Sequence, residues 1–253
     1  IVLFHCIGVS VVHHLRLMGK VLSKTFSNGG DNPLVVCGMS EGLGVEPILG
    51  KAREREREYD WLGAVESYKK VLGLISEHEF SRMGEIYERL GYAFHRAAMQ
   101  AESQAEFRER MQRAIEAYDR ASSFYEKSVE EQKKGRVFRC GAVAKYLSYW
   151  LTSVPSEKRK LLDDCLDFEG KALAVFSESG DTLEYGKTYS GLPLIFWLRF
   201  HLEWDRQICK SILEKGLGWG EKAAAPLSER GDQYEIAKAF LTRGICFSVY
   251  GEY

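Results

Sequence analysis

The strongest constraint on the fold of this chain is a near-repeat with a period of 51 residues. Residues 171–181 read KALAVFSESGD, and residues 222–232 read KAAAPLSERGD. Each copy is an amphipathic run that ends in Gly-Asp, with a glutamate three positions after the aspartate. Glycine ends helices at low cost in the left-handed conformation, and Asp with Glu three positions later is typical of a capping box. The pattern therefore predicts a helix that stops at Gly180, a new helix capped by Asp181, and the same arrangement one period later.

Small residues recur with the same period along most of the chain. The pattern Ala-x3-Tyr-x2-small spans residues 64–71 and recurs over residues 114–121, with weaker versions near residues 165 and 216. A second series lies between these segments and consists of Gly91, Gly141, Gly191 and Gly244. Two interleaved series with one period indicate one supersecondary unit that is repeated about four times. Small residues on one helix face allow a neighbouring helix to approach closely.

These motifs resemble the tetratricopeptide family. Its signature places a small residue in the first helix of a pair and Ala-x3-aromatic-x2-Ala in the second. Ala52 with residues 64–71 matches one pair, and LGYAF (90–94) with RAIEAYDRA (113–121) matches the next. The resemblance covers about residues 45–253 and implies an all-α, right-handed solenoid of antiparallel helical hairpins. The period of 50 to 51 residues exceeds the family's usual 34 or so, so we expect helices of about 20 to 25 residues.

The chain divides into two parts on this reading. We interpret residues 1–44 as an N-terminal apolar helix, over 1–25, and a glycine-rich connector with a short strand at LVVC. The opening run IVLFHCIGVSVV lacks the basic region and cleavage site of a signal peptide, and polar side chains interrupt it too soon for a complete membrane span. A remnant of an upstream domain and the end of a truncated membrane segment both stay open as interpretations.

Residues 45–253 are predicted to form the repeat array, with about four units and an unpaired last helix. Pro193 and Pro226 fall inside its expected helices, and interior prolines kink or break helices, so we expect the fourth unit to be irregular. The last helix ends in apolar residues, whereas the ends of solenoids need polar caps. We therefore expect the chain to be a section of a longer protein, or to be completed by association.

Composition and motifs argue against several classes of function. The 35 basic and 36 acidic residues leave a net charge of −1, which favours neither nucleic acid nor an anionic membrane as a partner. The six cysteines are scattered without a CxxC motif, so we expect reduced thiols and a cytoplasmic protein, although the even count permits disulfides. The histidines form no HExxH motif and no zinc-ligand spacing. We predict no catalytic residues, no metal and no cofactor.

The family resemblance implies a binding surface. In the family, the first helix of each pair lines a concave face that holds partners, at positions three before and one, four and five after the small residue. This rule selects Glu88, Tyr92, His95 and Arg96 around Gly91, then Phe138, Ala142, Lys145 and Tyr146 around Gly141, then Thr188, Leu192, Ile195 and Phe196 around Gly191. The first two sets suit a peptide's backbone and side chains, whereas the third is too apolar to stay open.

The sequence therefore predicts a non-enzymatic scaffold that binds a protein or peptide segment, as the regulatory arm of a larger signalling protein. Further domains of the same polypeptide are also possible partners. One alternative is a small-ligand sensor or enzyme, with a pocket where Gly191 and Pro193 disturb the stacking. The aromatic string IFWLRFHLEW (195–204) could line such a groove, although an inter-helix core explains it better. A third alternative is an RNA-binding helical repeat, which the neutral charge disfavours.

Overall fold

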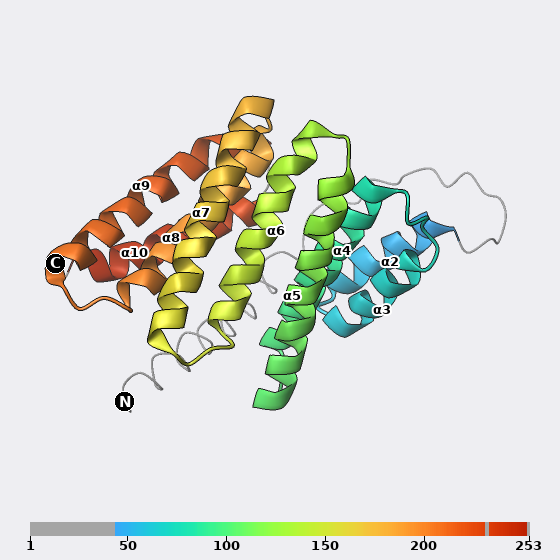
Figure 1. The fold of residues 1–253 in the computed structure, drawn as a ribbon, viewed down its shortest axis with the longest axis horizontal. Helices are drawn as coiled ribbons and strands as arrows, with labels where there is room; N and C mark the ends of the chain where they lie inside the picture. The colour runs from blue at the N-terminus through green and yellow to red at the C-terminus, as the bar shows by residue number, and fades with distance from the viewer. Residues whose placement is uncertain (1–43, 231–232, 252–253) are drawn as a thin grey trace.

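The computed structural model describes residues 44–230 and 233–251, and every regular element within them is an α-helix (Figure 1). In chain order these are α2 (Val45–Arg57), α3 (Trp61–Leu72), α4 (Phe80–Met99), α5 (Gln104–Lys127), α6 (Glu131–Tyr149), α7 (Pro155–Ser179), α8 (Thr182–Phe200), α9 (Arg206–Arg230) and α10 (Gln233–Tyr250). The predicted all-α class is confirmed. The helix expected over 1–25 and the strand expected at LVVC lie outside the described residues.

The helices pack mainly against their neighbours in the chain. Three hairpins, α4/α5, α6/α7 and α8/α9, make the most extensive contacts, and α5 in turn packs on α6 and α7 on α8. Helix α10 packs against both α8 and α9. In Figure 1 the hairpins follow one another along the long axis of the molecule, from α2 and α3 at one end to α9 and α10 at the other.

Glycines in the first helix of each hairpin set how closely its second helix approaches. A Cβ atom added to one of these glycines would lie 2.3 to 2.9 Å from a large side chain of the second helix, which is closer than atoms can pack. The three pairs repeat with an exact spacing of 51 residues: Gly84 with Tyr125, Gly135 with Phe176, and Gly186 with Leu227. The 51-residue spacing of the sequence echo is therefore also the spacing of these three contacts.

The glycine series singled out in the sequence is less uniform. A Cβ at Gly91 would lie 2.9 Å from the ring of Tyr118, and one at Gly141 would lie 3.1 Å from that of Phe168. Gly191, in contrast, has no atom within 4 Å of its missing Cβ. Because Gly84 and Gly91 meet Tyr125 and Tyr118 in reversed order, the two helices of this hairpin are antiparallel.

The junction between α7 and α8 has the predicted capping geometry. Gly180 follows α7 in the left-handed conformation with φ of 70°, where only glycine is free of strain. The Asp181 carboxylate then accepts a hydrogen bond of 3.1 Å from the backbone N–H of Glu184. The predicted helix stop and helix start are confirmed here. The second copy, at residues 231–232, lies outside the described part of the chain.

The prolines do not break the fourth hairpin, contrary to the sequence-based expectation. Helix α8 continues through Pro193 and α9 continues through Pro226. The ring of Pro193 is buried against Gly220 of α9, where an added Cβ would lie 3.2 Å from it. We infer that this packing helps to offset the backbone hydrogen bond that a proline removes.

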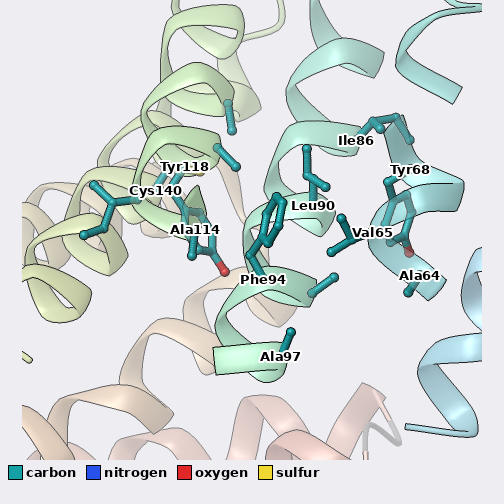
Figure 2. Packing of buried hydrophobic residues seen from close by; sticks show 14 of the residues in the cluster. Ala64, Val65, Tyr68, Ile86, Leu90, Phe94, Ala97, Ala114, Tyr118 and Cys140 are labelled. Atoms are coloured by element: carbon teal, nitrogen blue, oxygen red, sulfur yellow. The ribbon is translucent and has the colours of Figure 1, made fainter. Parts of the chain in front are cut away.

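The core between the described helices consists of four clusters of buried apolar side chains, and the largest extends from α2 to α6. Figure 2 shows its centre at α4, where Leu90 and Phe94 lie between Val65 of α3 on one side and Tyr118 of α5 on the other. Alanines fill the narrow points, and Ala64, for example, is fully buried. These small side chains allow close helix approach, as the Ala-x3-Tyr-x2-small pattern predicted.

Candidate functional site

The first predicted set of groove residues lies on α4, and two of its members, Tyr92 and Arg96, pack onto α3. The ring of Tyr92 meets the ring of Trp61 edge-on, with 5.6 Å between ring centroids. The Arg96 guanidinium lies 5.3 Å from the centroid of the same indole. Trp61 itself is 5% exposed, whereas Tyr92 and Arg96 are partly exposed. The tryptophan therefore orients an aromatic ring and a cation that both reach the surface.

His95 joins α4 to the next first helix. Its ring meets the ring of Tyr146 of α6 edge-on at 6.3 Å. Burial, with a smaller contribution from the positive charge of Arg96, lowers the pKa of His95 to about 4. The imidazole is therefore neutral at physiological pH and acts here as an uncharged aromatic ring.

The second set, on α6, does not share one face. Phe138 lies against Phe168 of α7, with 6.5 Å between ring centroids, and so faces the second helix of its own hairpin. Ala142 is fully buried. Lys145 and Tyr146 are partly exposed, and the ring of Tyr146 contacts His95 of α4. Of this set, the structure brings Tyr146 together with the α4 residues.

The third set is buried within the fourth hairpin. Thr188 is 2% exposed, and its hydroxyl donates a 2.9 Å hydrogen bond to the backbone carbonyl of Glu184. Leu192, Ile195 and Phe196 are also buried. Thr188 is thus a core hydroxyl satisfied by its own helix, and this part of the surface is closed, as its apolar character predicted.

Glu88 belongs to a network of ion pairs that links the first helices of three hairpins. Its carboxylate lies 3.1 Å from Nη1 of Arg136 and also pairs with Arg139, both on α6. The same two arginines pair with Glu184 of α8, with 3.2 Å between Arg136 and the Glu184 carboxylate. Tyr125 of α5 donates a 2.7 Å hydrogen bond to Glu88. The four charged side chains, two glutamates and two arginines, therefore form one cluster.

This network holds Glu88 in its charged form. Burial would raise the pKa of its carboxyl, but Arg139, Arg136 and the Tyr125 hydroxyl lower it to about 2. Side-chain exposure is 15% for Glu88 and 4% for Glu184. The paired arginines compensate the cost of burying these carboxylates. Both partners of each ion pair are therefore needed for stability. Glu88 is thus a structural residue at the contact between hairpins as well as a partly exposed one.

Sequence reasoning did not find Arg136, Arg139 or Glu184 as members of this cluster. The partners are 45, 48 or 51 residues apart, so charges of opposite sign about 51 residues apart were the available signal. Glu184 was noted only as part of a capping box, whose glutamate normally turns back to its own helix.

One buried carboxylate near this network has an oxygen atom without a hydrogen-bond partner. Glu169 of α7 is 8% exposed, and its Oε2 atom has no hydrogen-bond partner among the described residues. Burial raises its pKa to about 7, although the charges of Arg139 and Lys238 act in the opposite direction. Glu169 is therefore a carboxyl group that exchanges its proton near neutral pH.

Other chemistry is sparse in the described part of the chain. There, no three His, Cys, Asp or Glu side chains are grouped so that they could hold a metal ion, and Cys140, Cys165, Cys209 and Cys246 are free and buried. Burial raises the pKa of the Cys140 and Cys165 thiols well above the ordinary value, which disfavours reactive thiolates. None of the helices described has the length and apolar character to cross a membrane.

A small surface hollow lies between α9 and α10, and neither Gly191 nor Pro193, where the sequence placed a pocket, lines it. Gly220, Ile236, Ala239, Phe240 and Arg243 line it. Its cavity volume of about 10 Å³ is the space of a single water molecule. This hollow is too small to enclose a metabolite.

Comparison with known proteins does not assign the chain to a family. None of the family models matches it, and a search of curated proteins gives no significant match.

Proposed function

We propose that this chain is a non-enzymatic scaffold that binds a protein or peptide segment on the face of its first helices, and that the bound segment is acidic. The binding surface centres on Tyr92, His95 and Arg96 of α4 and on Tyr146 of α6. The bound segment lies across these four side chains, where His95 of α4 meets Tyr146 of α6.

The observation that carries this proposal is the unpaired charge of Arg96. Its guanidinium is held over Trp61, is partly exposed, and forms no ion pair with a carboxylate among the described residues. Arg89, about two turns earlier, already pairs with Glu56 at 2.9 Å. A cation that is oriented by an aromatic ring loses little conformational entropy when an anion binds. Arg96 is thus suited to a carboxylate of a partner.

The neighbouring rings favour a peptide over a free ion. Tyr92, His95 and Tyr146 each make an edge-on contact with another ring, so their orientations are set before a partner arrives. Aromatic side chains offer large apolar contact areas with few rotatable bonds, which is why binding surfaces are enriched in them. An extended acidic segment with apolar side chains would satisfy both the cation and the rings.

The architecture that we propose for this surface is a right-handed solenoid of tetratricopeptide type with lengthened hairpins. Three features support it: the 51-residue spacing of the glycine contacts, the antiparallel packing within hairpins and the lateral packing between them. Such arrays expose long binding surfaces because each unit contacts only its neighbours. The cysteines of the described residues are free and buried, which favours a reducing compartment, so we place this activity in the cytoplasm.

The proposal is tested by selecting displayed random peptides on the immobilised chain and measuring their affinity by fluorescence anisotropy. Selected peptides should be enriched in Asp and Glu, and Arg96→Glu should weaken their binding at least about tenfold, or about 1.4 kcal/mol. Arg113→Glu is the matched control, because Arg113 is a half-exposed arginine of α5 that pairs with Glu109 of its own helix. Selection without acidic enrichment, or equal effects of the two variants, would refute the proposal.

A further inference from the structure

Helix α10 exposes two phenylalanines on one side. Phe240 is 61% exposed and Phe247 is 50% exposed. Ala237 and Gly244 lie on the same stripe of the helix and are exposed as well. The spacing of three, four and three residues places all four on one face.

The repeat shows what this face does in the earlier hairpins. Residues one, two and three periods before Phe240 are Tyr189, Phe138 and Tyr87, and each packs against an aromatic ring of the second helix of its hairpin. One period before Ala237 is Gly186, which meets Leu227 of α9. The stripe on α10 is therefore the hairpin face of a first helix, and no helix among the described residues covers it.

The α4/α5 hairpin shows how such a face is covered, by an antiparallel helix with two large side chains seven residues apart. In α4 and α5, the small residues Gly84 and Gly91 are seven apart, and they receive Tyr125 and Tyr118, which are also seven apart. This arrangement fixes both the direction and the register of the covering helix.

Helix α10 carries both halves of this arrangement by itself. Its small residues Ala237 and Gly244 are seven apart, and so are its large residues Phe240 and Phe247. If a second α10 lies antiparallel on the first, the second copy's Phe247 covers Ala237 and the second copy's Phe240 covers Gly244. The same register places the first copy's rings on the second copy's small residues, as a twofold interface demands.

We propose that this face of α10 binds a second copy of the chain, in a symmetric antiparallel α10–α10 dimer. Charge supports this occupant, because Leu241 and Ser248 complete the stripe and it contains no ionisable side chain. At its edge, Arg243 is already paired with Glu221 of α9 at 2.5 Å. Dimerisation therefore covers apolar surface without burying an unpaired charge.

The interface consists of one helix pair, so the dimer should be weak and reversible. Stable complexes bury about 800 Å² on each partner, and a single helix contact offers less. We expect a dissociation constant on the order of micromolar. The interface lies on a different helix from Arg96, so the dimer and the peptide-binding surface can be tested separately.

Analytical ultracentrifugation over a range of concentrations tests the proposal with the whole chain. Wild type should pass from monomer to dimer as its concentration rises. Phe240→Asp should raise the dissociation constant at least about tenfold, because the symmetric interface would then bury one new carboxylate from each copy. Gly244→Leu should do the same by blocking close approach, and it is compatible with the monomer since nothing lies within 4 Å of the missing Cβ.

Gly170→Leu provides the matched control. Gly170 is exposed on α7, also without an atom within 4 Å of its missing Cβ, so this variant should dimerise like wild type. A chain that stays monomeric up to roughly 100 µM, two orders of magnitude above the expected constant, would overturn the proposal, whatever other helix covers the face. A dimer that neither Phe240→Asp nor Gly244→Leu weakens would overturn it as well.

Discussion

The carboxylate of Glu184, in the first turn of α8, lies 3.2 Å from the guanidinium of Arg136 of α6, 48 residues earlier in the chain. Its backbone N–H is capped by Asp181 in the way that the local sequence predicts. Its side chain crosses to the preceding hairpin, and it also accepts a 3.4 Å hydrogen bond from Lys187 of its own helix. One residue of the first turn of α8 thus ties two hairpins together.

Replacing Glu184 by alanine should destabilise the fold by about 3 to 5 kcal/mol, because Arg136 and Arg139 lose a buried counter-charge. Glu184→Gln keeps the size of the side chain and some hydrogen bonding, so its loss should be smaller. Urea unfolding followed by circular dichroism measures both. Glu178→Ala, at an exposed position on α7, should change stability by less than about 0.5 kcal/mol. If Glu184→Ala costs no more than this control, the network does not stabilise the hairpin junction.

Gly135→Ala should destabilise the protein although alanine is the better helix former. The added Cβ would lie 2.3 Å from the ring of Phe176, so either the ring or the whole of α7 must shift. Overpacking of this kind costs about 1 to 3 kcal/mol. Gly170→Ala, with open space around its missing Cβ, should instead stabilise by about 0.5 to 1 kcal/mol. Thermal unfolding of the two variants should therefore shift in opposite directions, and a shift in the same direction would contradict the close contact.

Glu169 should make the protein less stable as the pH rises from about 4.5 to 7. Its pKa is raised to about 7 in the folded state, from an ordinary value of 4.5. Between these values the unfolded chain releases the proton and the folded chain keeps it, so raising the pH favours unfolding. The effect should be on the order of 2 to 3 kcal/mol, at about 1.4 kcal/mol for each pKa unit.

The variant Glu169→Gln isolates this contribution. Relative to wild type, it should gain stability as the pH rises through this window, in urea unfolding at a series of pH values. Glu178→Gln, on the exposed side of the same helix, controls for the loss of one negative charge. A constant difference between Glu169→Gln and wild type from pH 4 to 8 would show that the carboxyl group titrates normally.

The period and the helix boundaries were within reach of the sequence because they depend on local chemistry. Gly180 and Asp181 adopt the conformations that a helix stop and a helix cap require, and those requirements act within a few residues. The continuity of α8 through Pro193 was not foreseeable in this way. It depends on Gly220, a residue of another helix, which leaves room for the proline ring.

Which residues of each first helix face the neighbouring helix was harder to predict than where the helix lies in the sequence. The sequence offered Gly91, Gly141 and Gly191 as one series, spaced by 50, whereas the hairpin contacts repeat with a spacing of 51. A shift of one residue turns a helical position by about 100°. Counting from Gly141 therefore selected Phe138, which faces α7. Glycine composition alone does not reveal which of several glycines lies under a neighbouring ring.

The pKa of His95 provides a test of the surface proposed for partner binding. It is lowered to about 4 in the folded state by burial and, to a lesser extent, by the charge of Arg96. Between about pH 6.5 and 4 the unfolded chain binds a proton at this histidine and the folded chain does not. The free energy of unfolding therefore falls as the pH falls through this range. His95→Gln should remove this loss. Its stability relative to wild type should therefore improve as the pH falls from about 6.5 to 4.

The contribution of Arg96 can be measured directly by NMR titration of the His95 ring. Arg96→Gln should raise the pKa of His95 because it removes a nearby positive charge, whereas Arg113→Gln on α5 should leave it unchanged. Burial is the larger cause, so the pKa in Arg96→Gln should still lie below 6.5. If His95 titrates near 6.5 in wild type, the ring is solvated and is not packed between α4 and α6. The ordered aromatic part of the binding surface would then be lost, and the peptide proposal would rest on Arg96 and Tyr92 alone.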